Sequence, residues 1–406
     1  MLVCSVIERA PAPRLRDARL ATKATHCCWI ALFALVLLLA DACSRNPTAP
    51  EKPISYVHPP PNGFFPWPQH DPAYSFAEYN QMMEQLFIIN NFGQYQGGTT
   101  PESMYLHDGL DIILENETQL FSVSDGHVAA ILGSMEGQRA IVIEDSGSFG
   151  SAWMYAHTDR FSVQPGDPVT QGHPIAIVSF PTGLGHVHLS RVSLREGGSW
   201  NSLDDYQYLF PDSFFFYPDS EPPVIETPFY FYQNKSDTEF PRTGSTVVSG
   251  EVDIVVAIRD PGEHARDSSG FGDRLCVGRI DYRILRDDHM LLERQSFDFR
   301  WSIIPRTPYE NSEVAQTVYK FWYTVQTDPP QSYSQIPSFY IITNSSGTEG
   351  FSILNPGTQT LCWDTREVGN DGTPVFPNGS YIISVAAYDH AGNQTVAADT
   401  VLVQNP

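Results

Sequence analysis

Hydrophobic and polar residues alternate along most of the chain between residues 92 and 194. The clearest alternating runs are LFSVSDGHVAAIL (120–132), RAIVIED (139–145), SAWMYAH (151–157) and HPIAIVSF (173–180). Successive side chains of a β-strand point to opposite faces, so this pattern predicts half-buried strands separated by turns. Just before them, residues 76–90 carry hydrophobic residues at helical spacing, which predicts one short helix.

A second region of alternating residues runs from position 223 to position 406. It begins with PVIETPFYFY and GEVDIVVAIRD and ends with GSYIISVAAYDHAGNQTVAADTVLV. The last run, a strand, a turn and a returning strand, resembles the closing hairpin of immunoglobulin-like or fibronectin-like sandwiches. We therefore expect residues 223–406 to form one immunoglobulin-like β-sandwich with a long insertion at about 288–355, in preference to two sandwiches. The whole protein is expected to be mainly β.

The N-terminal segment has the pattern of an export signal. Five basic residues precede the apolar run WIALFALVLLLA (29–40), which is too short to span a bilayer but suits the core of a signal peptide. The sequence ADACS (40–44) resembles a bacterial lipobox, in which a cysteine, here Cys43, becomes the lipidated N-terminus. Ordinary cleavage after Ala42 is the alternative. We predict a signal peptide at residues 1–42 and an outer-membrane lipoprotein of the cell envelope, facing the periplasm or the cell surface.

The composition after the signal peptide changes twice before the second β-rich region. Nine prolines between residues 47 and 72 predict an extended tether over residues 43–73. Residues 74–205 are the predicted first domain, and residues 206–222, rich in Asp, Tyr, Phe and Pro, a connector. Export into an oxidising compartment leads us to expect a disulfide between Cys276 and Cys362.

Acidic residues outnumber basic residues by 47 to 24, and the formal net charge is −23. Such a charge repels polyanions, so nucleic acid is excluded as a partner and anionic membrane surfaces are poor candidates. The hydrophobic share of 41% and the charged share of 17% are those of a folded chain rather than a disordered one.

Two histidines separated by one valine, in GHVHL (185–189), are the first candidates for chemistry. On a strand His186 and His188 would point to the same face, whereas on a helix they would lie about 200° apart. Two imidazoles on one face suit metal binding or acid–base catalysis. The alternative is a coincidence on a solvated sheet face.

Two upstream motifs, HDGLD (107–111) and YAH (155–157), add two imidazoles and a carboxylate to the same predicted domain. Catalytic zinc takes three protein ligands from His and carboxylate groups and leaves one position for water. Four imidazoles and one carboxylate would supply three ligands and leave two imidazoles for proton transfer and oxyanion stabilisation.

Other polar residues near these motifs have plainer interpretations. Asp108 and Asp125 each precede a glycine and are read as turn residues, and His127 and His173 as surface residues. His264, His289 and His390 lie in the second region, and none has another candidate ligand or catalytic residue at a motif-like spacing.

The motifs together resemble those of peptidase family M23, the zinc endopeptidases of the lysostaphin and LytM type. The resemblance covers about 100 residues and includes NNFGQYQ (90–96), HDGLDI (107–112), FSVSDGHV (121–128), YAHTDRFSVQPGDPVTQGHPIAIV (155–178) and GHVHL (185–189). It implies an antiparallel β-sheet or half-barrel peptidase domain for residues 74–205.

The resemblance also implies a role for each candidate residue. His107, Asp111 and His188 would bind Zn²⁺, and His157 and His186 would be the unligated catalytic pair. One of this pair would take the proton from the zinc-bound water, and both would stabilise the tetrahedral intermediate. The implied substrates are the peptide cross-links of bacterial peptidoglycan.

The chain departs from the family pattern at three places. Where HLHFE is usual, Val187, Leu189 and Ser190 replace the Leu, Phe and Glu. SFPTGLG (179–185) shortens the preceding turn, and LENETQ (114–119) replaces a Pro-x-Gly turn. No ligand is removed, but substrate fit and groove width stay open. Two alternatives remain: a non-catalytic envelope scaffold that binds the wall or activates other cell-wall hydrolases, and a peptidase acting on other peptides.

Overall fold

The structure is a computed structural model. It describes residues 64–96, 101–103, 105–134, 139–147, 150–180, 185–261, 275–301, 303–305, 308–320, 337–344 and 362–406. The predicted signal peptide and the predicted lipidation site at Cys43 lie outside these residues. None of the helices in the described part of the chain is both long enough and apolar enough to cross a membrane.

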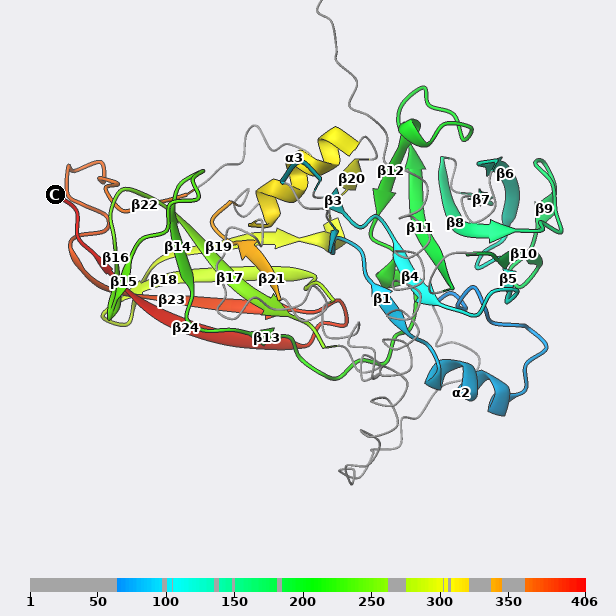
Figure 1. Ribbon diagram of the computed structural model, residues 1–406, viewed down its shortest axis with the longest axis horizontal. Helices are drawn as coiled ribbons and strands as arrows, with labels where there is room; N and C mark the ends of the chain where they lie inside the picture. Colours follow the sequence, from blue (N-terminus) through cyan, green and yellow to red (C-terminus); the bar gives the residue numbers. More distant parts are fainter. Residues whose placement is uncertain are drawn as a thin grey trace, which may run out of the picture. The chain divides into compact units, whose positions relative to one another are not determined.

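An eleven-stranded sheet carries residues of all three sequence motifs, and all of its strand pairs are antiparallel. Its main path is β1 (Ile88–Asn90), β4 (Leu110–Ile113), β11 (His186–Leu194), β8 (Ser151–Asp159), β7 (Arg139–Asp145), β6 (Gly126–Leu132) and β9 (Pro168–Val169). Four strands branch from this path: β5 (Gln119–Phe121), β10 (Pro174–Val178), β12 (Tyr206–Leu209) and β20 (Ile303–Pro305). In Figure 1, β11 lies between β4 and β8.

The two faces of this sheet bury different side chains, as the alternating pattern predicts. Trp153 and Tyr155 of β8 lie in one hydrophobic cluster, whereas Ala152 and Met154 lie in another. On β11, Val187 and Leu189 belong to the first cluster. His186 and His188 alternate with them and therefore point to the opposite face. The predicted mainly β, antiparallel fold is confirmed.

The predicted helix at residues 76–90 is wrong at its C-terminal end. Helix α2 (Phe76–Glu84) begins at a capping box formed by Ser75 and Glu78 and ends at Gln85. Residues 88–90 instead form β1, because their backbone pairs with β4. Sheet pairing therefore overrides the helical spacing of the side chains.

Two further sheets are formed by residues after position 223. The first contains β13 (Val224–Ile225), β14 (Tyr230–Gln233), β17 (Glu251–Arg259), β21 (Ser338–Ile341) and β22 (Trp363–Asp364). The second contains β15 (Arg242–Thr243), β16 (Ser245–Val248), β18 (Arg279–Arg286), β19 (His289–Asp298), β23 (Gly379–Tyr388) and β24 (Gln394–Val403). The two sheets contribute side chains to one hydrophobic cluster. The immunoglobulin-like assignment and the domain boundaries stay predictions.

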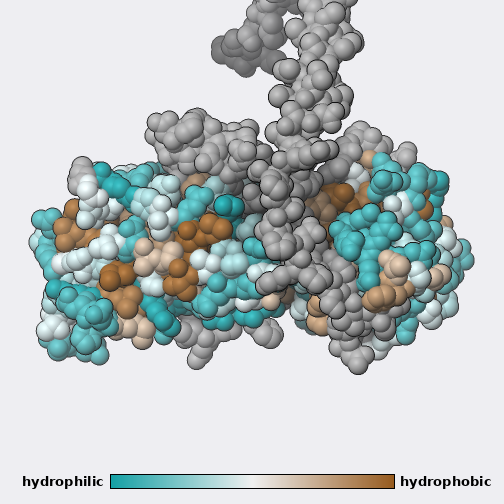
Figure 2. All heavy atoms as spheres, turned by 90° about the horizontal axis from the view of Figure 1, so that it is seen from below, coloured by the Kyte–Doolittle hydropathy of each residue, from teal (hydrophilic) through white to brown (hydrophobic). Residues whose placement is uncertain are grey.

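The same hydrophobic cluster reaches the first sheet. It joins Met154 of β8 and Val192 of β11 to Ile254 of β17 and Ile383 of β23. Two elements within residues 288–355 also contact the part of the chain before residue 223. Strand β20 pairs with β12, and helix α3 (Pro308–Val318) lies against β3 (Tyr105–Leu106). Figure 2 shows the described residues of one face mainly in teal and white, with hydrophobic residues in small separate brown areas.

The last part of the predicted tether packs onto the first sheet. Trp67 is buried and stacks on Phe215 with ring centroids 4.6 Å apart. Its indole nitrogen donates a hydrogen bond to the Phe216 carbonyl at 3.1 Å. Trp67 and the partly buried Phe65 therefore contribute to the hydrophobic cluster under the sheet.

The predicted disulfide between Cys276 and Cys362 is wrong, because both thiols are free. Cys276 is completely buried, and its Sγ donates a weak hydrogen bond to the Phe92 carbonyl at 3.3 Å. Burial also raises the pKa of this thiol well above its ordinary value, which disfavours the reactive thiolate.

Candidate metal and catalytic site

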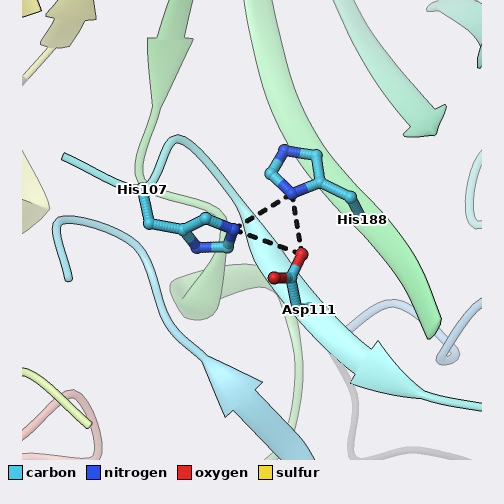
Figure 3. A group of neighbouring side chains, drawn as sticks. All are labelled: His107, Asp111 and His188. Atoms are coloured by element: carbon cyan, nitrogen blue, oxygen red, sulfur yellow. Dashed lines mark hydrogen bonds and ion pairs between the residues drawn. The ribbon is translucent and has the colours of Figure 1, made fainter. Parts of the chain in front are cut away.

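Three side chains from the sequence motifs meet at one point, as Figure 3 shows: His107, Asp111 and His188. Asp111 on β4 and His188 on β11 are direct cross-strand partners. Their side chains therefore leave the sheet on the same face and lie side by side. His107 reaches them from the turn between β3 and β4.

The donor atoms of this group are spaced like the ligands of a tetrahedral metal. His188 Nδ1 lies 2.8 Å from Asp111 Oδ1 and 3.1 Å from His107 Nε2. His107 Nε2 lies 3.2 Å from Asp111 Oδ1. Zinc bonds of about 2.0–2.2 Å in a tetrahedron would place such atoms roughly 3.3–3.5 Å apart. All three side chains are largely buried, and their imidazole and carboxylate donors are those that zinc prefers. The residues therefore fit a zinc ion.

The far nitrogen of His188 is held by two residues that sequence reasoning did not assign to the site. Asp108 Oδ1 lies 3.0 Å from His188 Nε2, and Ser190 Oγ lies 2.9 Å from it. A carboxylate on the outer nitrogen fixes the tautomer and the orientation of a ligand histidine. Asp108, expected to be only a turn residue, thus supports the site. The sequence signal that could have indicated this role is the position of Asp108 directly after the predicted ligand His107.

The charges of this group are strongly coupled. Burial lowers the pKa of His188, but its contacts with Asp108 and Asp111 outweigh burial and raise that pKa to about 10. Burial raises the pKa of Asp111, but His107 and His188 hold it well below its ordinary value. Asn90 Nδ2 also donates to Asp111 Oδ2 at 2.6 Å. Without metal, Asp111 is therefore ionised and His188 protonated at neutral pH.

His157 reaches the same side of the sheet through a β-bulge. On β8, Ala156 pairs with both His188 and Ala140, whereas Thr158 pairs with Arg139. His157 is thus the extra residue, and its φ of +59° lies in the left-handed region, which is rare for a non-glycine residue. Regular alternation would place its side chain on the opposite face of the sheet. The bulge instead places it on the face that carries His186 and His188.

His157 and His186 lie beside the ligand group without belonging to it. Their ring centroids are 4.5 Å apart, and Phe180 packs against both at 4.8 and 4.6 Å. Both histidines line a cavity of about 850 Å³ together with His107, Asp111 and His188. The structure therefore brings all five predicted site residues to one cavity. Tyr105, which is nearly half exposed, also lines it.

The remaining histidines in the described part of the chain lie elsewhere. His127 is half exposed, as expected, and lies 3.4 Å from Glu144. His390, for which the sequence suggested no partner, contacts Asp212 at 2.8 Å and the Cys276 Sγ at 3.7 Å. A second group of possible ligands offers three carboxylates, those of Asp219, Asp260 and Asp389. Lacking nitrogen or sulfur donors, it does not resemble a zinc site.

The backbone at Gly109 leaves no room for a side chain. A Cβ there would lie 2.6 Å from Ser190 Oγ, 2.7 Å from the Leu189 carbonyl and 2.9 Å from His188 Nε2. We expect Gly109→Ala to destabilise the fold by about 1–3 kcal/mol, as overpacking does, and to weaken zinc binding by displacing His188. Denaturant unfolding and a zinc competition titration would measure both effects.

Gly166→Ala is the control for this variant. Gly166 has a positive φ, and a Cβ added there would meet no atom within 4 Å, so alanine at this position strains only the backbone. It should lower stability without changing zinc affinity. Equal zinc affinity in Gly109→Ala and the natural sequence would contradict the expected displacement of His188.

One family model matches the segment of the chain that carries this site. Residues 105–199 match the family model described as peptidase family M23. Among solved structures, the catalytic domain of lysostaphin from Staphylococcus simulans is 20% identical, with 30% of this chain and 92% of that chain covered and a TM-score of 0.24. LytU is 23% identical over 29% of this chain and 80% of its own, with a TM-score of 0.24. A zinc-containing peptidase from Vibrio cholerae is 21% identical, with 26% of this chain and 32% of that chain covered and a TM-score of 0.23.

Proposed function

We propose that the protein is a zinc-dependent endopeptidase that hydrolyses peptide cross-links of bacterial peptidoglycan, because residues 105–199 match the model of peptidase family M23. One observation carries the proposal: three zinc-type donors and two further histidines converge on one cavity. Since no ligand residue of the motif is missing, the non-catalytic scaffold is the weaker alternative.

The proposed mechanism divides the five residues into two groups. His107, Asp111 and His188 would hold zinc, which when bound supplies a Lewis acid for the scissile carbonyl and lowers the pKa of a water molecule. His157 and His186 would take the proton of the attacking water and donate hydrogen bonds to the developing oxyanion. Phe180 packs against both rings, which restricts their orientation.

The decisive experiment is digestion of purified peptidoglycan with zinc-loaded protein, followed by mass spectrometry of the fragments. We expect cross-linked fragments to be converted to uncross-linked ones, with one new amino terminus for each bond cut. His188→Ala protein is the matched control. Binding to the wall without cleavage would support the scaffold, whereas cleavage of other peptides but not of wall would support a different peptidase substrate.

Zinc uptake should release protons, because zinc binds neutral imidazole and His188 has a pKa of about 10 in the metal-free protein. At pH 7.5 we expect release of about one proton from His188 per zinc, and an apparent affinity that rises about tenfold per pH unit toward pH 10. Calorimetry in buffers of different ionisation enthalpy measures this release. At pH 9, closer to this pKa, Asp108→Asn, which removes a contact that raises the His188 pKa, should release fewer protons than the natural sequence; identical release there would contradict the assignment.

We also propose that the protein acts outside the cytoplasm, anchored by a lipid on Cys43. The support is the export-type pattern of residues 1–42 and the wall substrate proposed above. In a bacterial host, Cys43→Ala is expected to move the protein from the membrane fraction to the soluble fraction. An unchanged membrane fraction would rule out this anchor.

A further inference from the structure

Asn91 connects the zinc-binding motif to the region of the chain after residue 223, here called the C-terminal region. Its side-chain amide makes two hydrogen bonds with the backbone of Cys276: Asn91 Nδ2 donates to the Cys276 carbonyl at 2.9 Å, and the Cys276 N–H donates to Asn91 Oδ1 at 3.0 Å. Both residues are buried. The amide therefore satisfies both backbone groups of Cys276 and is fixed in one orientation.

The backbone of the same residue holds His107. The Asn91 carbonyl lies 3.1 Å from His107 Nδ1. A carbonyl can only accept, so Nδ1 must carry the hydrogen of this bond and a neutral His107 ring presents Nε2 as a lone pair. This is the nitrogen that faces Asp111 and His188. Two backbone bonds, Gly93 N to the His107 carbonyl and His107 N to the Gln94 carbonyl, both at 2.8 Å, hold the residue from the same segment.

The C-terminal region contacts this segment, residues 91–94, at three further points. The Tyr319 hydroxyl donates to the Gly93 carbonyl at 2.8 Å, and Cys276 Sγ contacts the Phe92 carbonyl. Gly93 has a φ of +85°, and a Cβ there would lie 2.6 Å from the Phe299 ring. The C-terminal region thus contacts each residue from Asn91 to Gly93.

We propose that Asn91 is a positioning residue for the ligand His107, and that the C-terminal region, through Cys276, sets the place and the tautomer of this ligand. The inference rests on the proposed function, in which His107 binds zinc. It makes the C-terminal region part of the catalytic unit.

The test compares zinc and cobalt binding of full-length variants. Asn91→Ala removes both bonds to Cys276 and keeps the backbone carbonyl. We expect its zinc affinity, measured by competition with a chromophoric chelator, to fall about 10- to 100-fold, as for other partners of ligand histidines. The visible absorption bands of the Co²⁺-substituted protein should also shift, because they report ligand geometry.

Two milder variants keep the inference testable if Asn91→Ala does not fold. Asn91→Asp keeps the acceptor for the Cys276 N–H and loses the donor, and Tyr319→Phe loses only the hydroxyl bond to Gly93. Smaller shifts of the same Co²⁺ bands are expected for both. The control is Ser312→Ala, which removes another bond from the C-terminal region, Ser312 Oγ to the Glu102 carbonyl at 3.0 Å, without touching residues 91–94. Its affinity and spectrum should not change.

The outcomes separate this inference from the proposed function. Folded Asn91 and Tyr319 variants with unchanged affinity and unchanged Co²⁺ bands would overturn the positioning role. Ser312→Ala could also shift the Co²⁺ bands as much as the Asn91 and Tyr319 variants do. The shift would then report a general weakening of the contact between the C-terminal region and the chain before residue 223, and the inference would also fail. If His107→Ala still binds zinc normally, the proposed function itself fails.

Discussion

Replacing His188 with alanine is expected to reduce zinc from about one ion per chain to nearly none and to abolish hydrolysis of the cell wall. The variant keeps only His107 and Asp111, and catalytic zinc sites use three protein ligands. It also removes the imidazole that pairs with the carboxylates of Asp108 and Asp111. We expect the rate of bond cleavage to fall at least about 1,000-fold, since both activation of water and polarisation of the carbonyl are lost.

Elemental analysis of the purified protein and release of peptidoglycan fragments measure the two effects. His127→Ala is the matched control, because His127 is a half-exposed histidine of the same sheet that contacts Glu144 rather than the ligand group. Circular dichroism should show that both variants are folded. A His188→Ala protein that retains one zinc ion per chain would remove His188 from the ligand set.

Replacing either of the other two histidines is expected to have the opposite pattern: zinc is retained and hydrolysis is lost. His157 and His186 line the cavity but are not among the three converging donors. General acid–base groups contribute about 100- to 10,000-fold to a rate, so we expect losses in that range for His186→Ala and His157→Asn. Asparagine is chosen at 157 because it tolerates the left-handed φ of +59° better than most residues.

The two measurements are zinc content and the initial rate of wall digestion over a range of pH. His173→Ala, at an exposed histidine in a turn, is the control and should behave like the natural sequence. Loss of zinc from His157→Asn or His186→Ala would make these residues ligands. Full activity with zinc bound would show that water is activated without them.

The sequence was most informative where a regular strand carries the chemistry. A period of two places His186 and His188 on one face, and β11 has this geometry, with Val187 and Leu189 in the core on the other face. The two replaced hydrophobic residues of the motif therefore point away from the cavity. Ser190, which replaces the usual Glu of this motif, is completely buried and contacts His188 Nε2.

The rest of the site depends on features that no local pattern contains. The bulge at His157 arises from the register between β7 and β8, and it reverses the face that alternation would predict. Helix α2 ends early because residues 88–90 pair with β4, some 20 residues away. The contact between Asn91 and Cys276 joins residues 185 positions apart. Only the folded chain brings these residues together.

The pairing of β20 with β12 has a consequence for the order in which the protein matures. Gln207 pairs with Pro305, so the edge of the sheet that carries the site is completed by a strand made roughly 100 residues later. Contacts of such long sequence separation form slowly, because closing the long intervening loop costs chain entropy before the contact stabilises the fold. A nascent or truncated chain that ends before residue 303 lacks this strand and Tyr319. We therefore expect peptidase activity to appear only after residues 303–319 have been synthesised and have folded against the first sheet.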